Sequence, residues 1–175
     1  SWILAGNGNT TATSFLGTTT DFDLVFKRNS TISGRITNIP RNTSFGISTL
    51  AANTSGTYNT AFGSNALLSN TTGSNNTSCG SKALEFNTTG QWNSGFGRNA
   101  ITSNTTGSYN VGLGVTSMPY NTSGNYNLAI GVNTMFTNTI GSYNTVLGSS
   151  SDVGLNNLTN ATAIGAQAYV AQSNS

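Results

Sequence analysis

The acidic residues are the first candidates for chemistry, because this chain of 175 residues contains no histidine. The absence of histidine excludes Ser-His-Asp and Cys-His catalysis and histidine metal ligation. Four carboxylates remain, at Asp21, Asp23, Glu85 and Asp152. Asp21 and Asp23 would share one face of a strand, where they could hold a cation or serve in acid–base catalysis. Since most surface carboxylates only face solvent, the sequence predicts no catalytic residue, no metal site and no cofactor.

Residues 79–82 read Cys-Gly-Ser-Lys. They are candidates for a phosphate-binding loop and for a reactive thiol. Gly80, Ser81 and Lys82 lack the spacing of a phosphate-binding loop. Cys79 is the one cysteine, at a position that Phe or Leu fills elsewhere in the repeat described below. We therefore expect Cys79 to pack in the core, and we predict that the chain is not an enzyme.

Aromatic residues recur at intervals of 17 residues or twice that, at Tyr58, Trp92, Tyr109, Tyr126 and Tyr143. Aromatic side chains serve equally in cores, in interfaces and at wet surfaces where one end meets a polar ligand. We expect this column to pack in the core or at an interface between three chains. Stacking on sugar rings is the alternative.

Several Asn-x-Ser/Thr sequons match N-glycosylation acceptors, among them those that begin at Asn42, Asn53, Asn70, Asn87, Asn104 and Asn121. Each falls on or near a corner of the repeat. Asparagine tolerates the left-handed conformation and caps its own turn, so turn formation explains these residues without an attached sugar.

One 17-residue repeat organises all of these positions. Its first glycine column is Gly56, Gly73, Gly90, Gly107, Gly124 and Gly141, and its first asparagine column is Asn59, Asn76, Asn93, Asn110, Asn127 and Asn144. A second glycine column runs from Gly46 to Gly165, and a second asparagine column runs from Asn53 to Asn138. Four columns in phase indicate a solenoid, in which each coil buries its side chains against the next coil.

Apolar columns lie between the glycines. The column expected as the core ladder is Phe62, Cys79, Phe96, Leu113, Ile130, Leu147 and Ile164. A column of small residues from Ala61 to Ala163 precedes it, and a second aliphatic column from Leu50 to Met135 follows it. Each repeat is predicted to hold two short β-like pieces, such as 58–63 and 66–69, because helix is disfavoured at this density of Gly, Asn and Thr.

Stacking would place residue i over residue i+17, with parallel strands about 4.8 Å apart. Equivalent asparagines could then hydrogen-bond along the stack, and the glycines would take left-handed or tightly bent corners. A coil of 17 residues has a circumference of at most roughly 56 Å. Such a coil cannot hold both the aromatic column and the second aliphatic column, so one of them is expected to pack against other copies of the chain.

Charge and hydropathy exclude two classes of partner. Only 6% of the residues are charged, against about 25% in an ordinary domain. A net charge of +2 does not indicate nucleic-acid binding. No apolar run approaches the roughly 18 residues that a membrane helix needs, so we expect no membrane insertion by this segment.

The stretches NTAFGSNAL, NSGFGRNAI and NLAIGVNTM, and the closing NATAIGAQAYVAQSNS, resemble the head repeats of YadA-type trimeric autotransporter adhesins. The family pattern is Asn-Ser-Val-Ala-Ile-Gly-Ala-x-Ser. The opening FLGTTTDFDLVFKRN, followed by GRI, resembles the segment that leads into such repeats in tail-fibre-like bacterial and phage surface proteins. The repeat of this chain is longer than the usual unit of the family, which implies a longer outer loop.

The resemblance implies an all-β, left-handed parallel β-roll of about eight coils, assembled as a parallel homotrimer at a cell or virion surface. Its expected work is attachment, through a glycan or protein receptor on a host surface. We divide the chain into an N-terminal cap or connector (1–35), β-roll repeats (36–172) and a tail (173–175) that we expect to lead into a further segment. Leu158 and Ala161 replace the expected Gly and Asn and mark an altered last coil.

Two other functions fit the same solenoid. A phage tail-fibre shaft would use it as a spacer. An ice-binding solenoid would need a regular threonine array, but Thr60, Thr77 and Thr145 share their column with Val111 and Leu128. The sequence therefore favours the surface fibre or adhesin head.

Overall fold

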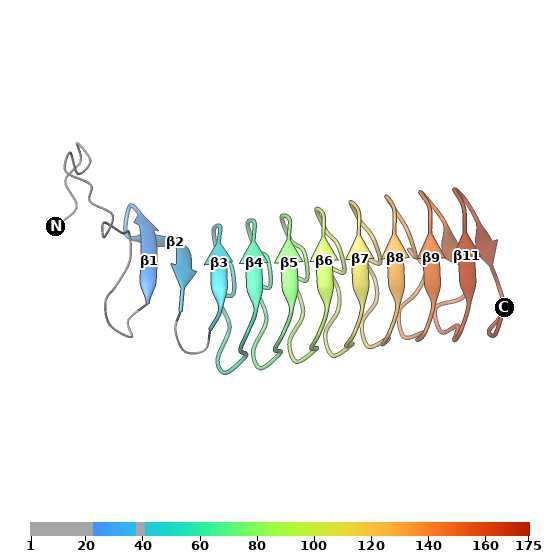
Figure 1. Cartoon of the computed structure of the whole chain (residues 1–175), viewed down its shortest axis with the longest axis horizontal. Coiled ribbons are helices and arrows are strands. Elements are labelled where there is room, and N and C mark those ends of the chain that lie inside the picture. Colours follow the sequence, from blue (N-terminus) through green and yellow to red (C-terminus); the bar gives the residue numbers. More distant parts are fainter. Residues whose placement is uncertain (1–22, 38–40) are drawn as a thin grey trace, which may run out of the picture.

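The chain winds into a long parallel β-solenoid, seen in a computed structural model that describes residues 23–37 and 41–175 (Figure 1). The described residues contain strands and turns and no helix. One ten-stranded sheet has the order β1-β2-β3-β4-β5-β6-β7-β8-β9-β11. Its strands are β1 (Leu24–Arg28), β2 (Thr31–Ile36), β3 (Thr43–Phe45), β4 (Thr60–Phe62), β5 (Thr77–Cys79), β6 (Ser94–Phe96), β7 (Val111–Leu113), β8 (Leu128–Ile130), β9 (Thr145–Leu147) and β11 (Thr162–Ile164). A second, two-stranded parallel sheet pairs β10 (Asp152–Val153) with β12 (Tyr169–Val170).

The register of the main sheet confirms the predicted stacking of residue i on residue i+17. Ala61 pairs with Ser78, and Ser78 pairs with Gly95, in parallel strands. The same register continues through β11, where Ala163 pairs with Val146. About eight coils of about 17 residues therefore form one continuous parallel stack.

Only one of the two predicted β-like pieces of each repeat is a strand. The piece at 58–63 contains β4, but 66–69 lies in turns. The reason is local, because Asn65 and Leu67 adopt the left-handed conformation with φ of 60° and 50°. The equivalent Ile101 has a φ of 50°, which is an outlier for a β-branched residue. Left-handed backbone costs roughly 1–2 kcal/mol per non-glycine residue, so contacts between the coils must offset it.

The core is one large side chain wide. The second aliphatic column supplies it, since Leu67, Leu84, Ile101, Met118 and Met135 are fully buried. The small column forms the opposite wall and is small because the coil is narrow. A Cβ added at Gly112 would lie 2.7 Å from Cγ1 of Ile101.

The predicted core ladder does not fill this interior, and that prediction is wrong for the single chain. Phe62, Cys79, Phe96, Leu113, Ile130 and Ile164 are exposed, and Leu147 is half-buried. Each three-residue strand points its middle residue inward and its last residue outward. A Phe or Ile has no room beside the Leu67 column, whereas Ala, Ser or Gly fits there.

Truncating one member of the buried column tests this assignment of the core. Leu84→Ala leaves a cavity between Leu67 and Ile101, and we expect a loss of about 2–5 kcal/mol in the free energy of unfolding. Ile140→Ala is the matched control, because Ile140 is half-exposed at a corner of its coil, and its cost is expected to stay below about 1 kcal/mol. Chemical denaturation of both variants measures the difference, and equal costs would refute the assignment.

A β-hairpin lies on the first coil. β1 and β2 pair antiparallel, and β2 pairs antiparallel with β3 through Gly34 and Phe45. The hairpin occupies the edge of β3 that would otherwise be open to pairing with another chain. β2 continues to Ile36, one residue past the predicted boundary of the cap, and residues 1–22 lie outside the described part.

The last coil departs from the repeat, as the sequence indicates. Leu158 takes the place of a column glycine, and its carbonyl oxygen accepts a hydrogen bond from Asn144 Nδ2 at 2.7 Å. Ala161 ends the first asparagine column, and its N–H donates to Asn144 Oδ1 at 2.9 Å. The final residues fold back on the last coil, where Thr162 N donates to Ser175 O at 2.7 Å.

Candidate functional site

The carboxylates that could do chemistry lie apart from one another. Asp23 Oδ2 is 3.9 Å from Arg35 Nε, and Glu85 Oε2 is 3.7 Å from Lys82 Nζ. Asp152 accepts hydrogen bonds from the N–H and the hydroxyl of Thr137. Asp21 lies outside the described residues. Among residues 23–37 and 41–175 no group of three or more His, Cys, Asp or Glu side chains could hold a metal ion.

The Gly80-Ser81-Lys82 stretch is a corner of the coil and not a phosphate cradle. Gly80 has a φ of +143°, and a Cβ there would lie 2.5 Å from the carbonyl oxygen of Gly97 in the next coil. Lys82 is itself left-handed, with a φ of 61°. The second glycine column therefore takes the corner conformation predicted for it.

The first asparagine column is a buried ladder that joins neighbouring coils. Asn93 shows the pattern, because its Oδ1 accepts the backbone N–H of Asn110 at 3.0 Å and its Nδ2 donates to the carbonyl oxygen of Gly107 at 2.8 Å. The same pair of bonds recurs from Asn42, just before the first full coil, to Asn144. The predicted hydrogen bonding of asparagines along the stack is confirmed.

The second asparagine column forms a parallel ladder of side-chain amides. Asn104 Nδ2 donates to Asn87 Oδ1 at 2.7 Å and to the carbonyl oxygen of Gly107 at 2.8 Å. The ladder stops at Asn138, whose Oδ1 has no partner, because Leu155 stands where the next asparagine would be. Asn70, Asn87, Asn104 and Asn121 are fully buried, so their sequons are closed to a glycosyltransferase in the folded chain.

Glycine is required in the first glycine column for a reason other than the expected corner conformation. These glycines do not adopt a positive φ. They are required because the next coil approaches them closely, and a Cβ at Gly107 would lie 2.4 Å from the carbonyl oxygen of Gly124. Both asparagine ladders also donate to the carbonyl oxygens of this column.

The aromatic column lies on the surface as a stack of parallel rings. The centroids of Tyr109 and Tyr126 are 4.7 Å apart, and those of Tyr126 and Tyr143 are 4.9 Å apart. Trp92 extends the stack at 6.3 Å. Both faces of Tyr109 and of Tyr126 are covered by neighbouring rings. A sugar therefore cannot stack on the faces of these two rings, while the ring edges remain exposed.

The outer face of the sheet carries the exposed aliphatic residues. We define the outer stripe as the last residue of strands β3 to β9 and of β11, namely Phe45, Phe62, Cys79, Phe96, Leu113, Ile130, Leu147 and Ile164. Around β7 and β8 the stripe widens, because Val111, Val115 and Val132 are also exposed. From β4 to β11, the columns two residues before and two residues after the stripe contain one charged residue, Arg98. A continuous apolar band on a single chain is typical of an interaction surface.

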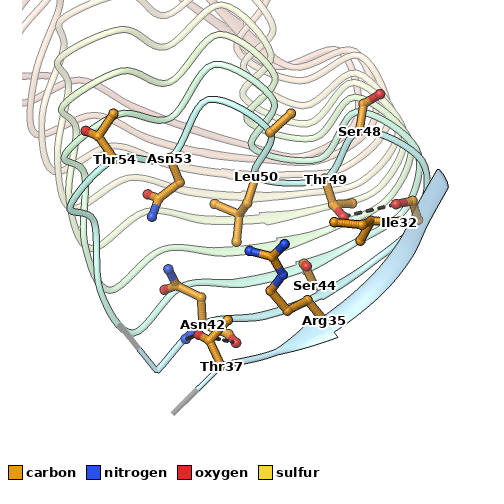
Figure 2. A pocket seen from close by; sticks show the side chains of 12 residues that line it. Ile32, Arg35, Thr37, Asn42, Ser44, Ser48, Thr49, Leu50, Asn53 and Thr54 are labelled. Atoms are coloured by element: carbon orange, nitrogen blue, oxygen red, sulfur yellow. Dashed lines mark hydrogen bonds between the residues drawn. The ribbon is translucent and has the colours of Figure 1, made fainter. Parts of the chain in front are cut away.

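A hollow of about 370 Å³ lies at the N-terminal end of the solenoid, within the first coil. Figure 2 shows the Arg35 side chain extending from β2 over Leu50, with Asn42 and Asn53 nearby. Leu50, Asn42 and Asn53 are the first members of columns that later coils cover. The hollow is therefore the uncovered end of the stack.

Sequence reasoning missed which apolar column faces out, although a signal was present. The column before the outer stripe holds only small residues in most coils, which marks the tight side of a narrow coil.

The described residues include no helix long and apolar enough to cross a bilayer. Comparisons with protein-family models, with curated proteins and with solved structures found no match for this chain.

Proposed function

We propose that this chain is a non-enzymatic segment of a surface fibre or adhesin head, assembled as a parallel homotrimer and working in attachment. The observation that carries the proposal is the outer stripe, in which Leu113 and Ile130 are 47% and 37% exposed on one chain. Monomers rarely expose a long contiguous apolar band. A threefold arrangement with the stripes facing the axis would bury it in all three copies.

The proposal places the aromatic column at the rim of the assembly. Interfaces combine an apolar centre with a polar, accessible rim, and tyrosines with exposed hydroxyls fit that rim. The remaining surface, rich in Ser, Thr and Asn, would face a glycan or protein on a host cell or matrix. Such a fibre belongs outside the cell or on a virion, and the resemblance to adhesin heads adds a left-handed winding.

Cys79 provides a test of the parallel arrangement, because it is the one cysteine and is exposed in the outer stripe. In a parallel trimer with the outer stripe at the axis, the three Cys79 thiols would lie at one level, and a disulfide needs their Cα atoms to be about 4.4–6.8 Å apart. We expect mild oxidation to give one disulfide-linked pair and one free chain in each trimer, seen on a non-reducing gel.

The matched control moves the thiol to another face. The double variant Cys79→Ser, Thr89→Cys places it on an exposed corner, where no cross-link is expected at the same protein concentration. If oxidation links the control as readily as the wild-type chain, or links neither, the stripe does not lie at a threefold axis. Glycan and matrix-protein arrays, probed with the trimer and with a stripe variant, then test the attachment itself.

The spacer function of a phage tail-fibre shaft remains the second candidate. A fibre held by two buried asparagine ladders and one apolar column over about eight coils suits a rod whose task is to hold distance. Arrays that stay blank with a stable trimer would favour this function over adhesion. The threonine hydroxyls do not favour ice binding, since Thr88 and Thr105 donate theirs to the next coil.

A further inference from the structure

The aromatic column brings three tyrosines into direct contact in a way that no part of the proposed function uses. Tyr109, Tyr126 and Tyr143 come from successive coils, with φ of 61°, 56° and 61°. The planes of their rings are tilted by only 2° and 7°. Neighbouring rings therefore lie face to face, at centroid distances of 4.7 Å and 4.9 Å.

The faces and the edges of these rings differ in their exposure to solvent. The three tyrosines are 47%, 48% and 55% exposed. Tyr109 lies between Trp92 and Tyr126, and Tyr126 lies between Tyr109 and Tyr143, so both rings have a neighbour on each face. Solvent therefore reaches the edges, which are where the hydroxyl group and the carbons next to it lie. This geometry offers little to a ligand that stacks on ring faces and leaves the phenol edge open to an oxidant.

We propose that Tyr109, Tyr126 and Tyr143 form a site of oxidative cross-linking, in which neighbouring rings are joined as dityrosine by a peroxidase-type one-electron oxidant with hydrogen peroxide. Each of two phenols loses one electron and one proton and becomes a phenoxyl radical. A carbon–carbon bond forms between the ring carbons adjacent to the oxygens, and the hydrogens on these carbons move to the oxygens. Two tyrosines and one hydrogen peroxide give one dityrosine and two waters.

The contact between the rings makes the reaction intramolecular. Holding two reacting groups side by side replaces a bimolecular encounter by a local step with a high effective concentration. The other tyrosines described lack this arrangement. Tyr120 packs at right angles to Phe136, with ring centroids 4.8 Å apart, and the coil after Tyr58 has Asn75 in the aromatic column. A dityrosine between two of the stacked residues would be a covalent staple across coils that are otherwise joined by hydrogen bonds and packing.

The site does not depend on the trimer, because the stack lies within one chain. The three residues precede β7, β8 and β9 in equivalent positions, outside the strands of the main sheet, and two stacked rings must turn toward each other for the carbon–carbon bond to form. The consequence is a chain that resists opening between coils after oxidation.

The test treats the purified chain with peroxidase and hydrogen peroxide and follows dityrosine fluorescence and mass. No Lys or Arg follows Arg98, so trypsin leaves all three tyrosines in one fragment, 99–175. We expect this fragment to lose two hydrogen atoms without any increase in chain mass on a reducing gel, at a rate independent of protein concentration.

Tyr126→Phe removes the middle ring and is expected to abolish the fluorescence, because Tyr109 and Tyr143 are then two coils apart. Tyr120→Phe is the matched control and should leave the yield unchanged. The proposal is overturned if the wild-type chain forms no dityrosine, if Tyr126→Phe keeps the wild-type yield, or if the product links two chains and rises with concentration. Circular dichroism of Tyr126→Phe shows whether the solenoid is retained.

Discussion

Gly107→Ala is expected to cause one of the largest losses of stability of any single methyl addition in this chain, about 3 kcal/mol or more in the free energy of unfolding. The added Cβ would lie 2.4 Å from the carbonyl oxygen of Gly124 and 2.4 Å from Oδ1 of Asn104. Both are closer than real Cβ contacts, and neither neighbour can move freely. The Gly124 carbonyl belongs to the backbone of the next coil, and Asn104 is fixed in the second asparagine ladder.

Gly165→Ala is the control that separates crowding from backbone conformation. Gly165 has a φ of +120°, and a Cβ there would meet nothing within 4 Å. Its variant bears only the conformational cost of a residue with a Cβ at this φ, about 1–3 kcal/mol. Thermal and denaturant unfolding of both variants gives the comparison. If Gly107→Ala is as stable as Gly165→Ala, the close approach of the coils is not what requires glycine in the first column.

Asn93→Ala is the second substitution with a large expected effect. It removes the acceptor of the Asn110 backbone N–H and the Nδ2 donor of the Gly107 carbonyl oxygen. The Gly107 oxygen keeps a second donor in Asn104, but the Asn110 N–H has no other acceptor among the described residues. A buried donor left without a partner costs about 1–3 kcal/mol, and the lost bonds and packing bring the expected total to about 2–4 kcal/mol.

Asn157→Ala is the matched control, because Asn157 is exposed and its side chain makes no hydrogen bond to another described residue. We expect its effect to stay within about 0.5 kcal/mol. Urea unfolding with an unchanged slope in both variants would show that the midpoint reports stability alone. A midpoint for Asn93→Ala equal to that of Asn157→Ala would contradict a structural role for the first ladder.

The period of the sequence was sufficient to predict the coil and its register. Glycine and asparagine recur in four columns because each is tied to a contact between coils that repeats once per turn. Asn93 and Asn104 could be recognised as ladder residues for this reason. The close approach at Gly107 could not, because a glycine at negative φ gives the same sequence signal as a glycine at a left-handed corner.

The direction of the apolar columns could not be read from hydrophobicity. Phe62 and Leu67 are both large and apolar, and each would gain by burial in a wider coil. The decision comes from size, because one large side chain fills the interior and leaves room opposite only for Ala61 and its small equivalents. The left-handed φ of 50° at Leu67 directs that side chain inward, and sequence propensity gives no warning of it.

The sequence predicted the candidate surfaces only in part. The spacing of Tyr109, Tyr126 and Tyr143 predicts a column, but their face-to-face contact depends on three equal backbone turns that the sequence does not reveal. The outer stripe was assigned to the core, so its exposure became visible only in the fold. The inference that one apolar column meets other copies of the chain stays a prediction.

Sedimentation equilibrium of the wild-type chain at micromolar concentration decides whether the chain assembles as a homotrimer. We expect a species of three times 18.0 kDa, and a shift to single chains when Leu113→Asp places a charge in the outer stripe. A wild-type chain that sediments as a stable monomer, with the outer stripe in water, would contradict the trimer and the function built on it.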